Sequence, residues 1–258
     1  MTKPQPRVAI VTGGLSGIGK ATTLALLQTG LRVAVGARRG GAADAAEAFG
    51  DHDPARLHIG ALDVRSEASV AEFCDRVRAR WAGIDILVNA AGVTVSQTVQ
   101  GHRLADWDDV LRTNLTGPFL MARACLPDMV AGRWGRIVNV ASTAARTAVA
   151  DHPAYCASKA GLVGLTKALA LEGAPHGVTC LSVSPTWVET DMLRATAAKL
   201  ATANGTTLAE EVARFAAENP QGRLAQPAEI AHLIAMLCGE EMPALTMEDI
   251  QVNAGAHW

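Results

Sequence analysis

Two side chains that can move a proton stand four positions apart in the segment Tyr155-Cys156-Ala157-Ser158-Lys159. Residues at this spacing share one face of a helix. A free phenol has a pKa near ~10, which is too high for efficient proton transfer at neutral pH. A nearby ammonium group favours the phenolate and lowers that pKa. Tyr155 is the only tyrosine in the chain, so no other phenol competes for this role.

Ser142 follows a β-branched run at residues 136–141 and precedes Tyr155 by thirteen residues. Its hydroxyl can donate a hydrogen bond to a substrate oxygen as charge develops there. A tyrosine and a lysine at helical spacing, taken alone, are more often surface residues than catalytic ones. Together with Ser142 and the glycine turn described next, they predict an oxidoreductase in which Tyr155 handles the proton and a nicotinamide cofactor handles the hydride.

The glycine turn is Thr12-Gly13-Gly14-Leu15-Ser16-Gly17-Ile18-Gly19. It follows a predicted strand at residues 7–12 and opens a predicted helix at 17–28, which is the context that a dinucleotide fingerprint requires. Glycines there let the backbone approach a pyrophosphate, and the helix N-terminus offers free N–H groups. The sequence therefore predicts a cofactor contact from Gly13, Leu15, Ser16, Gly17, Ile18 and Gly19.

The end of the second strand indicates which cofactor is used. An acidic residue there would hold a ribose 2′-hydroxyl, whereas arginine accommodates a 2′-phosphate. The chain has Gly36-Ala37-Arg38-Arg39 and no acid. Because a guanidinium binds phosphate as a bidentate fork, NADPH is favoured over NADH, with Arg38 as the first candidate and Arg39 as the second. The alternative is a solvated loop arginine.

Two further strand ends complete the predicted cofactor site. Asp63 and Val64 follow one strand, and Asn89, Ala90, Ala91 and Gly92 follow another. Ligands of open α/β sheets bind at the carboxyl ends of the strands. Asp63 can accept from an adenine amine, and the small residues after Asn89 leave room for the cofactor.

The elements that must position these residues alternate between short Val/Ile/Leu runs and longer amphipathic stretches. Continuous apolar runs are typical of parallel strands buried on both faces. The pattern predicts one α/β domain over residues 1–258, a doubly wound Rossmann sheet of about seven parallel strands. Strands are expected at 7–12, 31–36, 57–62, 84–89, 136–141 and 178–184, and helices at 17–28, 42–49, 66–81, 104–131 (bent near Gly117-Pro118) and 154–172.

Composition excludes several other classes. The formal net charge is −2 and basic residues are not clustered, which argues against a nucleic-acid partner. No apolar run approaches the ~18–20 residues of a membrane span. Five scattered cysteines form no CxxC pair, so neither a disulfide framework nor a zinc site is expected, and a cytoplasmic location is the default. Asp51-His52-Asp53 sits beside Pro54 in a predicted surface loop, and no metal site is expected there.

These motifs, in this order and spacing, resemble those of the short-chain dehydrogenase/reductase family over essentially the whole chain. The matching positions include Asn89-x-Ala91-Gly92, Asn114, Ser142 and Tyr155-x-x-x-Lys159. The resemblance implies that Tyr155 is the general acid in reduction and that Ser142 orients the carbonyl. It further implies that Lys159 binds the nicotinamide ribose and tunes Tyr155, and that Asn114 holds a relay water.

The resemblance also covers the segment after the sixth strand. Pro185-Thr186 stands where the family has Pro-Gly, and Pro185, Val188 and Thr190 match the segment that holds the carboxamide. Ala90 replaces the second asparagine of the usual Asn-Asn-Ala-Gly. Both departures touch cofactor packing rather than the proton-transfer residues. In this family the helices at 104–131 and 154–172 pair between subunits, which implies a homotetramer or homodimer.

A narrower resemblance is to ketoreductases of bacterial aromatic polyketide pathways, carried by residues 113–119, 135–143, 167–172 and 219–229. The early-acting branch commonly has Pro-Gly-Gly after Asn-Asn-Ala-Gly, but here Gly92 is followed by Val93-Thr94-Val95-Ser96. The expected substrate is therefore a carbonyl of a polycyclic aromatic polyketide in a later tailoring step, such as one on an angucycline ring. Antibiotic biosynthesis is the expected setting.

The specificity region is predicted at 189–219, a helical lid broken at Asn204-Gly205. Trp187, Met192, Leu193 and Phe215 are candidates for its apolar wall, or else they pack the lid onto the core. His152 either lines the pocket or is an ordinary loop histidine. The alternatives to a polyketide reductase are a 3-oxoacyl carrier-protein reductase or another short-chain alcohol dehydrogenase, a catalytically inactive nicotinamide sensor, and a sugar epimerase or dehydratase, whose glycine spacing this chain lacks.

Overall fold

The computed structural model describes residues 6–39, 41–50 and 52–256. Its centre is a parallel sheet in the order β3-β2-β1-β4-β5-β6-β7. Because the order reverses direction between β1 and β4, this is the switch point at which doubly wound sheets bind ligands. The strands are β1 (Val8–Thr12), β2 (Arg32–Ala37), β3 (Leu57–Ala61), β4 (Ile86–Asn89), β5 (Gly135–Val140), β6 (Val178–Pro185) and β7 (Asp249–Val252).

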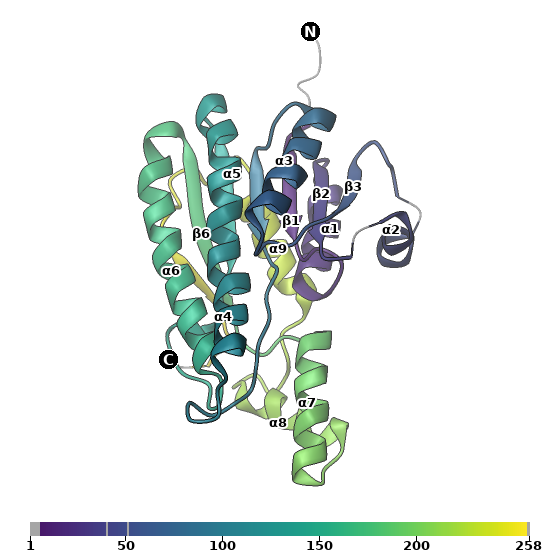
Figure 1. Ribbon diagram of the computed structural model, residues 1–258, viewed down its shortest axis with the longest axis vertical. Coiled ribbons are helices and arrows are strands. Elements are labelled where there is room, and N and C mark those ends of the chain that lie inside the picture. The colour runs from purple at the N-terminus through teal and green to yellow at the C-terminus, as the bar shows by residue number, and fades with distance from the viewer. Residues whose placement is uncertain (1–5, 40, 51, 257–258) are drawn as a thin grey trace.

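Helices cover both faces of the sheet (Figure 1). One apolar core joins the strands to α3, α5 and α6, and a second joins them to α1 and α9. Strands β1, β4, β5 and β6 are buried at every position, as the continuous apolar runs predict. The helices are α1 (Gly17–Gln28), α2 (Ala42–Phe49), α3 (Glu67–Trp81), α4 (Leu104–Leu111), α5 (Gly117–Gly132), α6 (Pro153–Gly173), α7 (Asp191–Asn204), α8 (Leu208–Glu218) and α9 (Pro227–Leu237).

The predicted fold class is confirmed, with small shifts at the ends of elements. The fourth strand begins at Ile86 rather than at residue 84. The long helix expected at 104–131 divides into α4 and α5, and the break precedes Gly117. The connecting turn is π-helical, Arg112–Thr116, and it contains Asn114. Within the described residues, no helix is long and apolar enough to cross a membrane.

A row of buried polar side chains crosses the sheet near the ends of its strands. The register aligns Thr12 with Asn89, Asn89 with Asn139, Asn139 with Ser182, and Ser182 with Asp249. Asn89 Nδ2 donates to Asn139 Oδ1 at 2.8 Å, and Asn139 Nδ2 donates to Thr166 Oγ1 of α6 at 2.9 Å. Because Thr166 belongs to the helix that carries Tyr155 and Lys159, the row ties that helix to the sheet.

Helices α7 and α8 project beyond the carboxyl ends of the strands (Figure 1). Their break falls where the sequence places it, at Gly205 with φ +67°. Glu211 of α8 accepts hydrogen bonds from Asn204 and Thr206 at the end of α7. The two helices therefore hold together as a unit through a carboxylate as well as through their apolar contacts.

Candidate active site

The glycine turn between β1 and α1 forms a wall of bare backbone. A Cβ on Gly19 would lie 2.3 Å from Gly13 O, and one on Gly13 would lie 2.8 Å from the Cα of Ala91. Gly13 also has φ +67°, a conformation that side chains disfavour. The Thr12 hydroxyl accepts from the backbone N–H groups of Ala90 and Ala91 at 3.1 Å each. The glycines therefore allow the β4 exit and the first turn to approach closely, as a pyrophosphate cradle requires.

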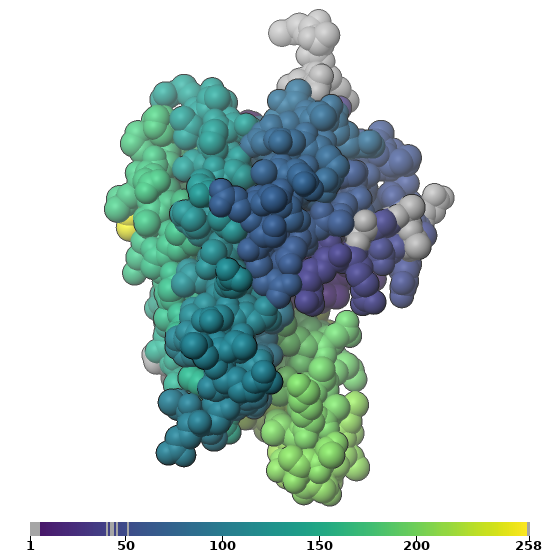
Figure 2. Space-filling model, in the orientation of Figure 1, coloured from purple at the N-terminus to yellow at the C-terminus, as the bar shows by residue number. Residues whose placement is uncertain are grey.

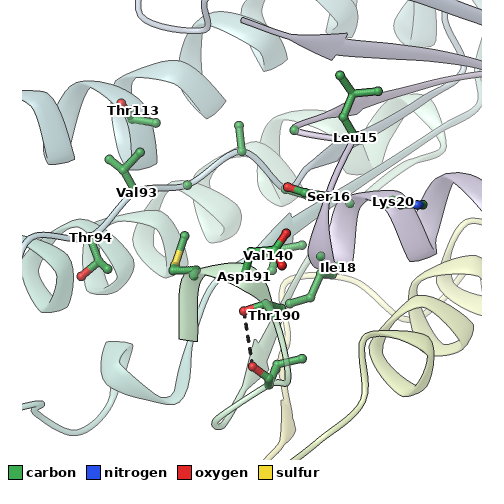
Figure 3. Close-up of a pocket in the computed structure, with 18 of the residues that line it drawn as sticks. Leu15, Ser16, Ile18, Lys20, Val93, Thr94, Thr113, Val140, Thr190 and Asp191 are labelled. Atoms are coloured by element: carbon green, nitrogen blue, oxygen red, sulfur yellow. Dashed lines mark hydrogen bonds between the residues drawn. The ribbon is translucent and has the colours of Figure 1, made fainter. Parts of the chain in front are cut away.

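A cleft of about 740 Å³ opens over this turn. Figure 2 shows α7 and α8, in green, at the lower end of the molecule, against the teal segment beside them. In Figure 3, Ser16 and Ile18 lie on one side of the cleft, and Val93 and Thr94 lie on the other. The cleft brings together most of the predicted site residues, namely Gly13, Leu15, Ser16, Gly17, Ile18, Gly19, Arg38, Arg39, Asp63, Val64, Ala90, Ala91, Gly92, Ser142, Tyr155, Lys159, Pro185, Val188 and Thr190.

Tyr155 enters the cleft from the first turn of α6, and Ser142 enters from the end of β5. Burial raises the pKa of Tyr155, while a side-chain hydrogen bond with Ser142 acts in the opposite direction. The phenol is protonated near neutral pH, which is the form that donates a proton to a carbonyl oxygen, and the raised pKa makes it a weaker acid than a free phenol. Because burial is the larger of the two effects, the pKa of Tyr155 lies above its ordinary value, and the lowering by Lys159 that the sequence indicates stays a prediction.

Lys159 lies close to Tyr155 on the same helix. Its Nζ lies 5.6 Å from the centre of the Tyr155 ring and donates to Val140 O at 2.7 Å. The side chain is 5% exposed, and burial lowers the pKa of Lys159 to about 8. The ammonium group is thus fastened to the β5 backbone beside the phenol rather than to the phenol itself.

Asn114 and Asn89 lie behind the cleft rather than in its lining. Asn114 is fully buried, its Oδ1 accepts from Val93 N, and its Nδ2 donates to Val93 O, each at 2.9 Å. Nδ2 also donates to Ser158 Oγ at 3.1 Å. The Asn114 side chain therefore holds the segment after β4 against α6. Asn114 reaches this position because it lies in the π turn.

The cationic end of the cleft lies at the exit of β2. Arg38 and Arg39 are both exposed and line the cleft together with Lys20, which the sequence analysis did not single out. The Asp63 carboxylate already accepts hydrogen bonds within the protein, which the sequence did not predict. Arg65 Nε and Nη2 donate to it at 2.9 and 2.8 Å. This hydrogen bonding lowers the pKa of Asp63. Contact with an adenine amine would use its remaining lone pairs.

The lid, α7 and α8 with the segment that precedes them, contributes apolar side chains to the cleft. Trp187, Met192 and Leu193 line the cleft, and Trp187 and Leu193 also pack in the small core of the lid. Phe215 does not line the cleft: the centre of its ring lies 4.5 Å from that of Trp187, with the two rings tilted, in a small core that packs the lid. The alternative of core packing therefore holds for Phe215. Thr190 caps α7 by accepting from Leu193 N at 3.3 Å.

Some residues that line the cleft were not predicted from the sequence, and for others the sequence left two interpretations open. His152, three positions before Tyr155, lines the cleft, and its Nδ1 lies 2.7 Å from Ala150 O. Val93, Thr94 and Thr113 line it as well. For Val93 and Thr94 the available signal was their position after the exit of β4, whereas Thr113 lies in the π turn between two helices. Asp51 lies outside the described residues, and those that are described contain no cluster suited to a metal ion.

The family model for short chain dehydrogenases matches residues 7–201. The chain belongs to this family. It is an oxidoreductase of the ketoreductase type, acting on carbonyl or hydroxyl groups.

Similar proteins come from two metabolic settings. A 3-oxoacyl-(acyl-carrier-protein) reductase of Aquifex aeolicus is 36% identical, with 98% of each chain covered. A protein of Streptomyces virginiae, named as the ketoacyl reductase of a monensin polyketide synthase, is 39% identical, with 99% of this chain and 98% of the relative covered. A variant of the actinorhodin polyketide ketoreductase, solved with NADPH, superposes with a TM-score of 0.91 at 35% identity, covering 99% of this chain and 98% of the other.

Proposed function

We propose that the chain is an NADPH-dependent ketoreductase that reduces a carbonyl of a polycyclic aromatic polyketide. The observation that carries the proposal is one cleft that is lined by Tyr155, Ser142 and Lys159 and also by exposed Arg38 and Arg39. The glycine turn fits the cofactor, because its backbone occupies the space that Cβ atoms would fill. When bound, the nicotinamide supplies the hydride.

The residues of this chain supply the proton and the orientation. Ser142 donates a hydrogen bond to the substrate oxygen, and Tyr155 passes its phenolic proton to that oxygen as negative charge builds there. Tyr155 is protonated at neutral pH, which is the form that can donate. Lys159, held by Val140 O, keeps a positive charge beside the phenol and can reach the ribose hydroxyls. Asn114 braces the β4 exit around them.

The cationic end of the cleft supports NADPH, and a paired substitution tests it. Arg38→Ala removes a charge-assisted hydrogen bond to a phosphate, so KM for NADPH should rise by roughly 10- to 100-fold while KM for NADH stays the same. Arg39→Ala is the matched control with a smaller effect. Equal loss with both cofactors would refute the phosphate role of Arg38.

The apolar side chains of Trp187, Met192 and Leu193 along the cleft support a polycyclic substrate, and so does the likeness to the actinorhodin enzyme. The second candidate, a 3-oxoacyl carrier-protein reductase, is favoured by the Aquifex aeolicus relative. Steady-state assays with NADPH should show turnover of a polycyclic quinone ketone at a higher kcat/KM than of an acetoacetyl thioester. Rapid reduction of the thioester with no reaction of the quinone would reverse the assignment.

We also propose that the protein forms a homotetramer or homodimer through α4, α5 and α6. Apolar side chains are exposed on these helices at Leu104 (73%), Phe119 (44%) and Leu171 (65%). Exposed apolar side chains mark an association surface where they form a contiguous patch. Light scattering should report a mass of two or four chains, and a monomer would contradict the proposal.

A further inference from the structure

A buried carboxylate on β7 is connected to the loop that follows β5. The side chain of Asp249 is 1% exposed. Its oxygens accept from Ser182 Oγ at 2.8 Å, Ser184 Oγ at 2.6 Å, Gln251 Nε2 at 2.8 Å and Arg146 Nε at 2.8 Å. A buried charge is costly unless it is paired and fully hydrogen-bonded, and this one is both.

Three of these donors belong to the sheet itself. Ser182 lies in register with Asp249, and Ser184 lies in register with Gln251, so β6 and β7 present all four side chains on one face. These neutral donors anchor the carboxylate to the strands. Arg146 is the donor that comes from outside the sheet, and it also supplies the only positive charge among the four donors.

Arg146 ends the short turn that begins at Ser142. The turn is a single 3₁₀ segment, Thr143–Ala145, in which Ser142 Oγ accepts from Ala144 N at 3.2 Å and Arg146 N donates to Thr143 O at 3.0 Å. A second guanidinium nitrogen, Arg146 Nη2, donates to Asp249 O at 3.3 Å. The turn is thus held by β5 at its first residue and by β7 at its last.

We propose that Arg146 and Asp249 are positioning residues that hold the turn 142–146 so that the Ser142 hydroxyl reaches Tyr155 and the substrate oxygen. The inference rests on the proposed role of Ser142 in the reaction. Neither Arg146 nor Asp249 lines the cleft, whereas Ser142 does, so their effect on the reaction passes through Ser142.

The connection has a chemical consequence that packing alone lacks. The hydrogen bond from Ser142 opposes the rise in the pKa of Tyr155 that burial causes. If the turn shifts, this hydrogen bond weakens and the pKa of Tyr155 rises further. The other groups that face Tyr155 are Lys159 at 5.6 Å and Cys156, whose charged form raises the pKa. Both belong to α6 and stay in place when Arg146 changes.

The test is a double-mutant cycle in the intact protein with NADPH and a ketone substrate. Arg146→Gln should lower kcat by roughly tenfold, the equivalent of one charge-assisted hydrogen bond. Added to Ser142→Ala, it should lower kcat no further, because the residue through which it acts is gone. In the alcohol-oxidation direction, which needs the phenolate, the pH limb of kcat should move to higher pH in Arg146→Gln. Arg146→Lys should recover part of both effects.

Two further variants separate position from stability. Arg78→Gln removes an ion pair to Asp128 between α3 and α5 and should lower the melting temperature without moving the pH limb. Asp249→Asn should move the pH limb of kcat for alcohol oxidation to higher pH, as Arg146→Gln does. The inference would be overturned if Arg146→Gln lowered kcat by the same factor in the wild type and in Ser142→Ala. It would also be overturned if the pH limb of kcat for alcohol oxidation stayed in place in both Arg146→Gln and Asp249→Asn. Wild-type kcat in Ser142→Ala would instead overturn the proposed role of Ser142.

Discussion

Lys159 Nζ lies beside the Tyr155 ring, 5.6 Å from its centre, yet donates its 2.7 Å hydrogen bond to Val140 O. The two residues are one helical turn apart on α6, and the main chain of β5 sets the distance between them. Because the ammonium group has been taken out of water, its pKa falls to about 8. The site therefore holds a positive charge at neutral pH at a cost to the stability of the fold.

That cost predicts a stability gain on substitution. In Lys159→Met, the free energy of unfolding at pH 7 should rise by ~1 kcal/mol, the desolvation penalty less the lost hydrogen bond to Val140. The folded-state pKa of about 8 lies below the ordinary 10.5, so the wild type gains stability as pH rises between these values. The advantage of the variant should shrink over that window. Urea unfolding at pH 7 and pH 9.5 measures it, and a constant difference would contradict the burial effect.

Tyr155→Phe should remove the proton donor while leaving the cleft intact. We expect kcat to fall by roughly 10²- to 10⁴-fold, the usual contribution of general acid catalysis. Cofactor affinity should stay within about twofold, because the phenol hydroxyl is not part of the glycine turn. Stopped-flow reduction assays and fluorescence titration with NADPH give the two values. Near-wild-type turnover would show that another group supplies the proton.

The backbone wall at the glycine turn predicts a sharp contrast between two alanine substitutions. Gly19→Ala places a Cβ 2.3 Å from Gly13 O, so the turn must move and cofactor binding should be lost. Gly83→Ala meets nothing within 4 Å and should bind the cofactor normally. Calorimetric titration with NADPH compares them. Unchanged affinity in Gly19→Ala would mean that the turn is not the phosphate cradle.

The lid should depend on Glu211, whose side chain is 4% exposed. Its Oε1 accepts from Asn204 Nδ2 at 3.2 Å, Thr206 Oγ1 at 2.5 Å and Arg214 Nη1 at 2.9 Å, and these contacts lower the pKa of Glu211. Glu211→Ala should loosen α7 from α8 and raise KM for the ketone several-fold more than KM for NADPH. Hydrogen exchange should rise in 191–218. Exposed Lys199→Gln on α7 is the control, and equal effects on both KM values would argue against a lid role.

Much of the fold followed from local patterns. The strand runs and the glycine turn are continuous in sequence, so their burial and their geometry are encoded within a few neighbouring residues. β7 was not located from the sequence, because four residues give little periodic signal and only two of Asp249–Val252 are apolar. The π turn at Arg112–Thr116 was foreseen only as a bend, since a local helical pattern does not reveal one extra residue per turn.

In the site, too, local features were predicted from the sequence and long-range contacts were not. Spacing and resemblance placed Tyr155, Lys159 and Ser142 in one cleft. They did not reveal that Lys159 bonds to Val140 or that Phe215 packs behind Trp187, because both depend on how distant elements meet. Arg146 and Asp249 are 103 positions apart, and neither stands in a motif. Long-range pairs of this kind are visible only when the strand order is known.

The π turn between α4 and α5 determines the direction in which the Asn114 side chain points around the helix axis. One residue turns an α-helix by about 100°, and a π turn accommodates one residue beyond the α-helical repeat. Loss of a single residue within 112–116 would therefore rewind the junction and swing the amide away from Val93, however well the remaining residues suit a helix. A one-codon deletion there should harm the enzyme more than most substitutions of the same residues.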